Sequence, residues 1–271
     1  MIDLSDIEGR LPPFEPGTVW LVGAGPGDPG LLTIAGLFAL RAADVIVYDA
    51  LVGDAILNLA NPAAAKQFAG KRGGRPSHVQ IDITLSLIEH ARAGKRVLRL
   101  KGGDPYVFGR GAEETLALAE ADIRYHIVPG ITSGLGGLAA AAIPATTRDT
   151  NHAVILMTGH PAAGAEEGVD HVDWAAFAAT GAPLVLYMSM GNLAAIADAL
   201  TAGGMDAETP VAVVTNATTA DQRVLVTSLH RAAEDVAVAG MKAPAIVAIG
   251  SIVGVRAALL AHAIGPLGAT P

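Results

Sequence analysis

The chain has 271 residues, of which 51% are apolar and 16% are charged, and it contains no cysteine. This composition suits one large or two ordinary folded domains, and the missing cysteines exclude disulfides and thiolate metal sites. The formal net charge of −8 disfavours long-range attraction to nucleic acid, so an anionic ligand would need a local basic cluster. No run approaches the roughly 18 apolar residues of a membrane span. Residues 1–17 lack the basic and apolar regions of a signal peptide, so a cytoplasmic location is expected.

The first half of the chain alternates short apolar strands with amphipathic helices. Continuous apolar strands between such helices predict a parallel sheet that is covered on both faces. The predicted strands are 18–23, 45–48, 66–69, 96–101 and 124–128, and the predicted helices between them are 31–43, 53–60, 80–93 and 111–121.

A second series of strands and helices follows Pro129 and Gly130. One of its strands follows its predecessor so closely that the second sheet is predicted to be mixed. The fold class is therefore α/β, with two α/β domains and the active site in the cleft between them. The predicted strands are 152–158, 183–188, 210–215, 223–227 and 244–249, and the predicted helices are 173–179, 191–203, 228–239 and 252–262. The predicted domains are 18–131 and 132–262, flanked by an N-terminal extension, 1–17, and a tail, 263–271.

The loop LVGAGPGDPGLLT, residues 21–33, carries glycines in the G-x-G-x-x-G register of a dinucleotide-binding turn. Asp49 ends the second predicted strand, about where a ribose-binding acid is expected. However, Pro26 and Pro29 lack the N–H groups that a phosphate would accept from, and Asp28 would repel a pyrophosphate. The loop is therefore interpreted as shaping a non-phosphate site, with a nicotinamide or flavin site and a turn without a ligand as alternatives.

A second glycine turn, RLKGGDPYVFGRGAEE, spans residues 99–114 and follows a strand that ends at Lys101. Gly102 and Gly103 carry no side chain, so the backbone there can approach a ligand closely. Two glycine turns after two parallel strands indicate the carboxyl edge of one sheet. Open α/β sheets bind their ligands at that edge.

Several strings occur together in the order that one family shows. On these strings the chain resembles, from residue 18 to about residue 255, the tetrapyrrole methylase family, the class III S-adenosylmethionine-dependent methyltransferases. The resemblance implies a bound S-adenosylmethionine, a small-molecule tetrapyrrole substrate and a homodimer, and it places the first glycine loop where the methyl donor and the tetrapyrrole meet. The strings are VGAGPGDPGLLT, ADVIVYDALV, GKRGG, RLKGGDPYVFGRG, VPGITSG, AAIPATTRD, MTGH, LVLYM and TTADQRV, with APAIVAIG after the last.

The resemblance also implies roles for individual residues. Asp49 is the implied general base for the proton released after methylation, and a strand-end turn or helix cap is its alternative role. Lys71 is the implied acid or anion partner, and simple carboxylate binding is its alternative. The implied donor-binding residues are Pro26, Gly102, Gly103, Asp104, Val107, Thr132, Ser133, Met188 and Ala217, the last at a position where the family often has Gly.

The implied substrate is rich in carboxylates, which suits a local basic cluster. Basic residues near the ends of parallel strands are predicted to face one edge of the first sheet and to bind these carboxylates, Arg through its bidentate fork. For each of them, an ordinary surface or helix-cap role is the alternative. The residues are Arg72, Arg75, Lys101, Arg110 and Arg148; Pro76 and Thr147 nearby stand where the family commonly has His.

The implied reaction is C-methylation of uroporphyrinogen III at C2 and C7, which gives precorrin-2 for the sirohaem and cobalamin routes. In-line transfer from a sulfonium depends on positioning, and no metal is expected because the histidines show no metal-ligand spacing. One alternative is a methyltransferase of the same fold that acts on a later corrin precursor. A nucleic-acid or protein methyltransferase and a nicotinamide oxidoreductase are further alternatives. The acidic composition counts against the nucleic-acid alternative and the loop prolines count against the nicotinamide one.

Overall fold

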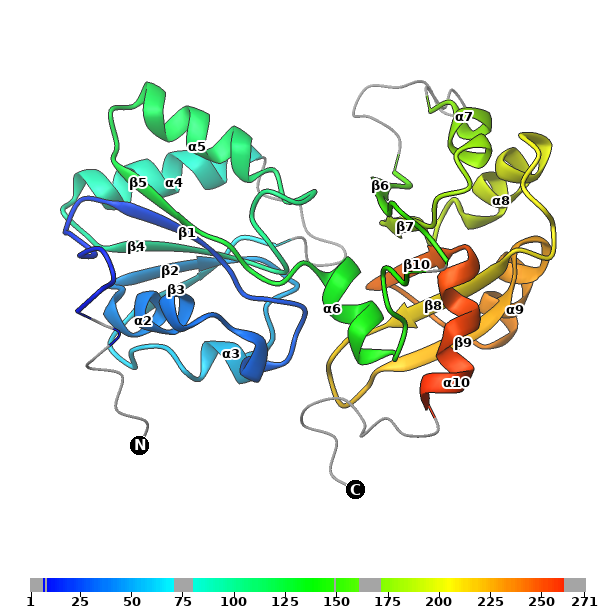
Figure 1. Cartoon of the computed structure of the whole chain (residues 1–271). Coiled ribbons are helices and arrows are strands. Elements are labelled where there is room, and N and C mark those ends of the chain that lie inside the picture. Colours follow the sequence, from blue (N-terminus) through cyan, green and yellow to red (C-terminus); the bar gives the residue numbers. More distant parts are fainter. Residues whose placement is uncertain (1–6, 8, 71–79, 149, 161–171, 261–271) are drawn as a thin grey trace. The chain divides into compact units, whose positions relative to one another are not determined.

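The computed structural model describes residue 7 and residues 9–70, 80–148, 150–160 and 172–260. The chain divides into two compact units, residues 1–132 and 133–271. Each unit is built on its own five-stranded sheet (Figure 1). Within the described ranges, no helix is both long enough and apolar enough to cross a bilayer.

The sheet of the first unit is parallel throughout, with the strand order β3-β2-β4-β1-β5. The predicted parallel sheet is therefore confirmed. Its strands are β1 (Val19–Gly23), β2 (Val45–Tyr48), β3 (Ala65–Phe68), β4 (Val97–Lys101) and β5 (Tyr125–Val128). Its helices are the 3-10 helix η1 (Pro29–Leu31), α2 (Ile34–Ala42), α3 (Asp54–Leu57), α4 (Gln80–Arg92) and α5 (Gly111–Glu120).

Helices cover both faces of this sheet (Figure 1). Trp20 and Val22 of β1 belong to a buried cluster with Leu40 of α2. The alternate positions of the same strand, such as Leu21, belong to a second buried cluster with Leu87 of α4. Successive side chains of a strand point to opposite faces, so a strand covered on both sides is apolar at every position.

The first predicted helix is shorter than the apolar pattern suggested. The Thr33 hydroxyl accepts a hydrogen bond from the Gly36 amide at 3.0 Å, so α2 begins at Ile34 rather than at residue 31. The Asp28 carboxylate accepts from the Gly30 amide at 2.7 Å and caps η1. Both helix starts in this loop are thus capped by side chains of the chain itself, which leaves them poorly suited to a pyrophosphate.

The sheet of the second unit is mixed, as the sequence predicted. Its order is β6-β7-β10-β8-β9, with β6 and β7 parallel and the other neighbours antiparallel. The strands are β6 (Ile155–Thr158), β7 (Leu184–Tyr187), β8 (Pro210–Thr215), β9 (Arg223–Ser228) and β10 (Ala245–Ile249). The helices are α6 (Ser133–Ala140), α7 (Trp174–Ala179), α8 (Leu193–Ala202), α9 (Ala232–Val238) and α10 (Arg256–Leu260), with 3-10 helices η2 (Leu229–Arg231) and η3 (Ser251–Val255).

The two faces of this sheet are covered differently. Leu184 and Leu186 of β7 belong to a buried cluster that includes Leu200 of α8 and residues of α7 and α9. The alternate residue Tyr187 faces α6 instead, where its hydroxyl accepts a hydrogen bond from the Gly134 amide at 3.1 Å. The glycine is needed at this point because a Cβ on Gly134 would lie 2.2 Å from the Tyr187 hydroxyl.

Candidate functional site

The loops that follow β1, β4 and β5 are joined at the carboxyl edge of the first sheet. Gly25 and Gly103 exchange two backbone hydrogen bonds, of 3.1 Å and 2.8 Å. A Cβ on Gly23 would lie 2.6 Å from the Gly103 carbonyl oxygen, and a Cβ on Gly130 would lie 2.2 Å from the same atom. Three turns therefore touch backbone to backbone, which only glycine permits.

Gly102 is glycine for a reason that the sequence did not reveal. Its missing side chain was interpreted as room for a ligand, but a Cβ there would lie 2.6 Å from the Cβ of Leu51. The turn after β2 thus packs directly on the turn after β4. Gly103 has a φ of 68°, a left-handed conformation that favours glycine.

Asp104 holds this edge together through both of its carboxylate oxygens. One oxygen accepts a hydrogen bond from the Tyr106 amide at 2.8 Å, and the other accepts from the Gly130 amide at 3.0 Å. Val107 continues the same turn, with its amide 3.4 Å from the Asp104 carbonyl oxygen. The carboxylate of Asp104 therefore positions the turn after β4, residues 102–110, against the loop after β5.

Asp49 lies beside the turn after β4 and is half-buried. One carboxylate oxygen accepts from the Leu51 amide at 3.0 Å, and the other is 3.3 Å from the Gly102 amide, which donates to it. The turn role that was the alternative for Asp49 is therefore present. A carboxylate has about four acceptor positions, so these two contacts leave Asp49 able to accept a proton as well.

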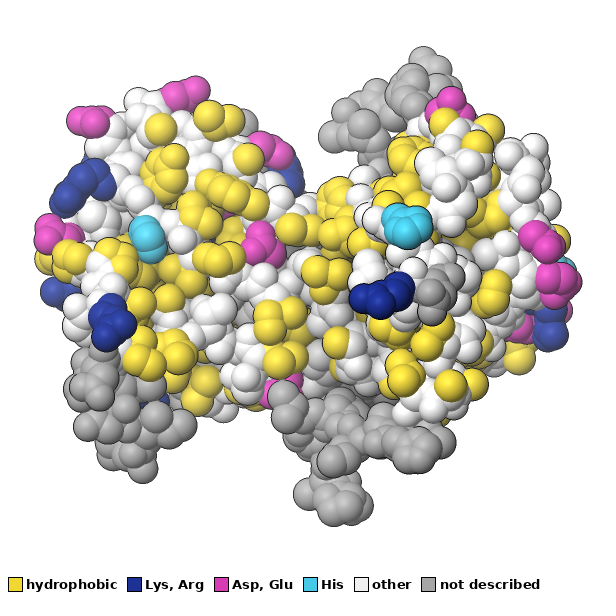
Figure 2. Space-filling model, viewed as in Figure 1, with side chains coloured by type: hydrophobic (Ala, Val, Ile, Leu, Met, Phe, Trp, Pro, Cys, Tyr) yellow, Lys and Arg dark blue, Asp and Glu magenta, His cyan; other side chains and the backbone are white. Residues whose placement is uncertain are grey.

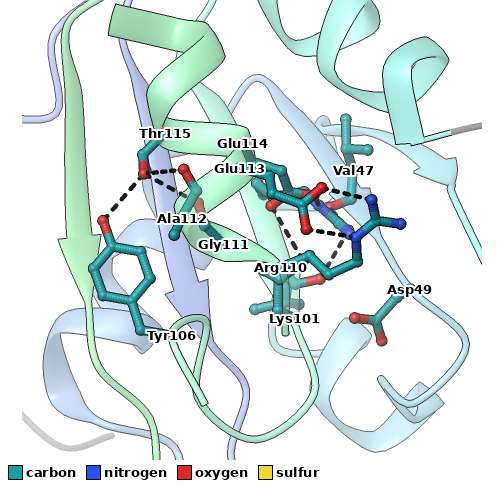
Figure 3. Close-up of polar contacts among 12 residues, drawn as sticks. Val47, Asp49, Lys101, Tyr106, Arg110, Gly111, Ala112, Glu113, Glu114 and Thr115 are labelled. Carbon is teal, nitrogen blue, oxygen red and sulfur yellow. Dashed lines mark hydrogen bonds and ion pairs between the residues drawn. The ribbon is translucent and has the colours of Figure 1, made fainter. Parts of the chain in front are cut away.

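Lys101 is buried in an ion-pair cluster, and this corrects the prediction that it faces the substrate edge. Its Nζ lies 3.1 Å from one oxygen of Glu114 (Figure 3). Nε of Arg99 lies 3.0 Å from the other oxygen. The exposed fractions of the three side chains are 5% for Lys101, 0% for Glu114 and 3% for Arg99. Burial and the neighbouring Arg99 lower the pKa of Lys101, although Glu114 and Asp49 oppose this shift. The amine is thus occupied with Glu114.

Two further predicted substrate ligands, Arg110 and Arg148, lie in the described part of the chain. Arg110 is exposed and pairs with Glu113, with Nε 2.9 Å from the carboxylate. This pairing raises the pKa of Arg110 and lowers the pKa of Glu113. Arg148 is exposed and belongs to the second unit, so its place beside the first sheet stays a prediction. Lys71, Arg72, Arg75 and Pro76 lie outside the described residues.

The second unit brings Met188 and Ala217 to one edge of its own sheet. Because β7 and β8 both run antiparallel to β10, their carboxyl ends lie on the same side. Met188, which follows β7, has a φ of 53° and is 53% exposed. Asn216 and Thr218, which flank Ala217, have φ values of 47° and 66°. Non-glycine residues in this conformation are strained by about 1–2 kcal/mol each, and such strain is often found at functional sites.

Ala217 is buried and packs against α6. A Cβ on Gly137 would lie 3.0 Å from the Cβ of Ala217, so the extra methyl group at this family position is accommodated by a glycine of α6. Thr132 is buried at the end of the first unit, and Ser133 begins α6. Pro26 is half-buried in the loop after β1.

Sequence reasoning did not identify Arg99, Glu114 or Ser189. The signal for Arg99 was the strand VLRLK, where two basic residues fall on one face of a buried strand and therefore require a buried acidic partner. Ser189 gave no signal; it is fully buried after Met188, and its hydroxyl has no hydrogen-bond partner within the described part of the chain. Across the same part of the chain, no group of three or more His, Asp or Glu residues could hold a metal ion.

The sequence matches the family model described as Tetrapyrrole (Corrin/Porphyrin) Methylases over residues 18–233. It is 56% identical over 259 residues to a uroporphyrinogen-III C-methyltransferase from Sinorhizobium sp. The aligned region covers 96% of this chain and 91% of that protein. It is also 45% identical over 247 residues to a siroheme synthase from Edwardsiella ictaluri. That match covers 90% of this chain but 51% of the synthase, so the chain spans about half the length of this relative.

Solved structures show the same fold. The uroporphyrin-III C-methyl transferase from Thermus thermophilus, complexed with S-adenyl homocysteine, matches with a TM-score of 0.73 and 38% identity over 88% of this chain and 99% of that chain. A cobalt precorrin-4 methyltransferase matches with a TM-score of 0.78 and 26% identity over 90% of this chain and 98% of that chain. With the family model matching most of its length, this chain belongs to the tetrapyrrole (corrin/porphyrin) methylase family.

Proposed function

We propose that this chain uses S-adenosylmethionine to methylate uroporphyrinogen III at C2 and C7, which yields precorrin-2. The similarity to the Sinorhizobium enzyme over nearly the whole length of both proteins supports this substrate. The donor is supported by the S-adenyl homocysteine bound to the Thermus relative. The observation that carries the proposal is the contact between the Asp49 carboxylate and the Gly102 amide, because a base at Asp49 would act directly beside the proposed donor turn, residues 102–110.

The chemical step requires positioning and one proton acceptor. A pyrrole carbon of the substrate bonds to the methyl group as the bond from that methyl to sulfur breaks, and the donor leaves as a neutral thioether. The methylated macrocycle is then cationic and loses a proton. Asp49 is the proposed acceptor, because two backbone amides orient its carboxylate while further lone pairs stay available.

The proposed ligands come from both units. Gly102, Gly103, Asp104 and Val107 form one part of the donor site, together with Pro26. The proposed donor site is completed by Thr132, Ser133, Met188 and Ala217. The cleft between the two domains stays a prediction. Lys71 is still proposed as the acid or anion partner. Arg72, Arg75, Arg110 and Arg148 are proposed to bind substrate carboxylates. Lys101 is no longer in this set because its amine is buried against Glu114.

The test compares Asp49→Asn with the wild-type chain. Asparagine keeps one acceptor oxygen for the turn but cannot take the proton, so we expect methyl transfer to fall by about 10²–10⁴-fold while the Kd for S-adenosylhomocysteine changes little. Asp198→Asn, at an exposed position of α8, is the matched control. Unchanged turnover in Asp49→Asn would remove the proposed base. Failure of the wild-type chain to bind S-adenosylhomocysteine would reject the methyl-donor proposal itself.

The second candidate substrate is a later corrin precursor. The similarity to a cobalt precorrin-4 methyltransferase favours it, but the 26% identity there is well below the 56% identity to the Sinorhizobium enzyme. Separate incubations with each tetrapyrrole and labelled donor distinguish the two candidates. Turnover of the later precursor alone would reject uroporphyrinogen III as the substrate.

An RNA substrate has little support on the visible surface. On the face drawn in Figure 2, the Lys and Arg side chains of the described residues lie singly and do not form a continuous basic patch. Phosphate binding depends on several cations acting together, so this face is a poor RNA surface. The homodimer and the cytoplasmic location stay predictions.

A further inference from the structure

We infer that Glu114 is a positioning residue that holds the donor turn closed by binding Lys101 across it. This inference rests on the proposed function, because the turn between the two residues carries Gly102, Gly103, Asp104 and Val107. Lys101 is the last residue of β4 and directly precedes Gly102. Glu114 lies in the first turn of α5, which begins where the donor turn ends. Their contact of 3.1 Å therefore joins the two ends of the turn (Figure 3).

The strand pattern explains why this contact forms inside the protein. Arg99 and Lys101 are two residues apart in β4, so both side chains point to the same face of the sheet. Val97, on that face, packs in the cluster that contains Leu118 of α5. Glu114 lies one turn before Leu118 on α5, and it reaches both cations from there. Arg99 is also held by the carbonyl oxygens of Val47 and Leu100, at 3.3 Å and 3.4 Å.

A gain in stability does not by itself explain why three charged side chains are buried here. Buried ion pairs lose hydration on both sides, and well-packed apolar residues often replace them without loss of stability. What a buried ion pair does provide is a strong preference for one geometry, because either partner left alone is heavily penalised. Here that preference acts on the distance between the two ends of the donor turn.

The donor turn needs such an external restraint. Phe108 and Arg110 are not glycines, yet their φ values are 53° and 57°. The turn is also tight, since a Cβ on Gly111 would lie 2.3 Å from the Pro105 carbonyl oxygen. A strained, tight turn relaxes when its ends are released, and this would displace the backbone proposed to bind the donor. Binding of the donor should suffer more than the chemical step of the loaded enzyme.

The experiment uses the full chain with Glu114→Gln and, separately, Lys101→Met. Lys101→Met removes the link across the turn but leaves the Arg99–Glu114 pair in place. We expect the Kd for S-adenosylhomocysteine and the KM for S-adenosylmethionine to rise about tenfold or more, with kcat changed less than about threefold. We also expect faster hydrogen exchange at residues 102–110, with the exchange of β1 and β4 unchanged. Glu120→Gln, an exposed glutamate at the end of the same helix, should change none of these quantities.

The results separate this inference from the proposed function. If the variants fold and keep both the wild-type affinity for S-adenosylhomocysteine and the wild-type exchange at 102–110, the positioning role is overturned. If the wild-type chain binds no S-adenosylhomocysteine, the proposed function fails, but the exchange comparison still decides whether Glu114 holds the turn. If neither variant folds, the wild-type exchange decides: residues 102–110 should exchange more slowly than the loop at 203–209, and equal rates would overturn the inference.

Discussion

The two units organise the carboxyl ends of their strands in different ways. In the first unit, glycine turns touch backbone to backbone, and the carboxylates of Asp49 and Asp104 bind neighbouring amides. In the second unit, strained non-glycine residues follow β7 and β8, such as Met188 after β7, and glycines of α6 accommodate side chains of the sheet. Every buried charged side chain found in the described ranges belongs to the first unit. Geometry is therefore imposed by absent side chains and by charge in one unit, and by side-chain packing in the other.

Gly130→Ala should have the largest effect, because it inserts a methyl group into a backbone-to-backbone contact. The new Cβ would lie 2.2 Å from the Gly103 carbonyl oxygen and 2.7 Å from the Gly23 Cα, and no side chain can move aside to relieve this. We expect the free energy of unfolding to fall by about 3 kcal/mol or more, measured by denaturant titration. Gly254→Ala, where a Cβ meets nothing within 4 Å, is the control and should stay within about 0.5 kcal/mol. A loss below about 1 kcal/mol for Gly130→Ala would show that the three turns are not in firm contact.

Gly134→Ala tests the same kind of crowding in the second unit, where the obstacle is a side chain. The new Cβ would meet the Tyr187 hydroxyl, which a rotation of the ring can displace. We expect a loss of about 2 kcal/mol. Tyr187→Phe alone should cost about 1 kcal/mol because the Gly134 amide loses its acceptor. The double variant should then lose about 1 kcal/mol less unfolding free energy than the two single variants lose together. Strict additivity in this double-mutant cycle would contradict the proposed contrast between the units.

Ser189→Ala should stabilise the second unit. The hydroxyl is buried without a hydrogen-bond partner in the described part of the chain, so replacing it with hydrogen removes a desolvation cost of about 1 kcal/mol. The matched control is Ser86→Ala in the first unit, where the hydroxyl bonds to Gln67 at 3.0 Å and its loss should destabilise by a similar amount. Thermal unfolding should show a raised Tm for Ser189→Ala and a lowered Tm for Ser86→Ala. A lower Tm for Ser189→Ala would mean that the hydroxyl has a stabilising partner.

The pH dependence of stability should carry a small signature of the buried charges in the first unit. The pKa of Lys101 is lowered below its ordinary value of 10.5, so the unfolded chain binds this proton more tightly than the folded chain. Burial of the charged lysine therefore opposes folding at neutral pH, and this penalty is relieved as the pH rises through the lowered pKa towards 10.5. Relative to Lys101→Met, the wild-type chain should gain stability over that alkaline range. Lys242→Met, at an exposed position of the second unit, is the control. A wild-type chain that loses stability relative to Lys101→Met there would indicate a raised pKa.

Much of the fold could be predicted because the spacing of apolar residues differs between strands and helices. The ranges predicted for β2 and β8, 45–48 and 210–215, coincide with the observed strands. The pattern failed where a side-chain cap decided the boundary: Thr33 ends the loop before α2, although the apolar residues begin at Leu31. A helix of four residues, α3, likewise replaced the longer helix predicted over 53–60.

The sequence by itself determined the family, the two α/β units and the identity of the turns that carry the proposed site, because these follow from local strings and periodicity. Only the tertiary structure decided what each side chain contacts. It placed Asp49 on the amide of Gly102, 53 positions away, and Arg99 on Glu114, 15 positions away. The same structure added a packing contact with Leu51 to the role proposed for Gly102, and it showed that Lys101, predicted to bind substrate, is buried. Such contacts depend on strand order and on the facing of side chains across layers, which a linear pattern does not encode.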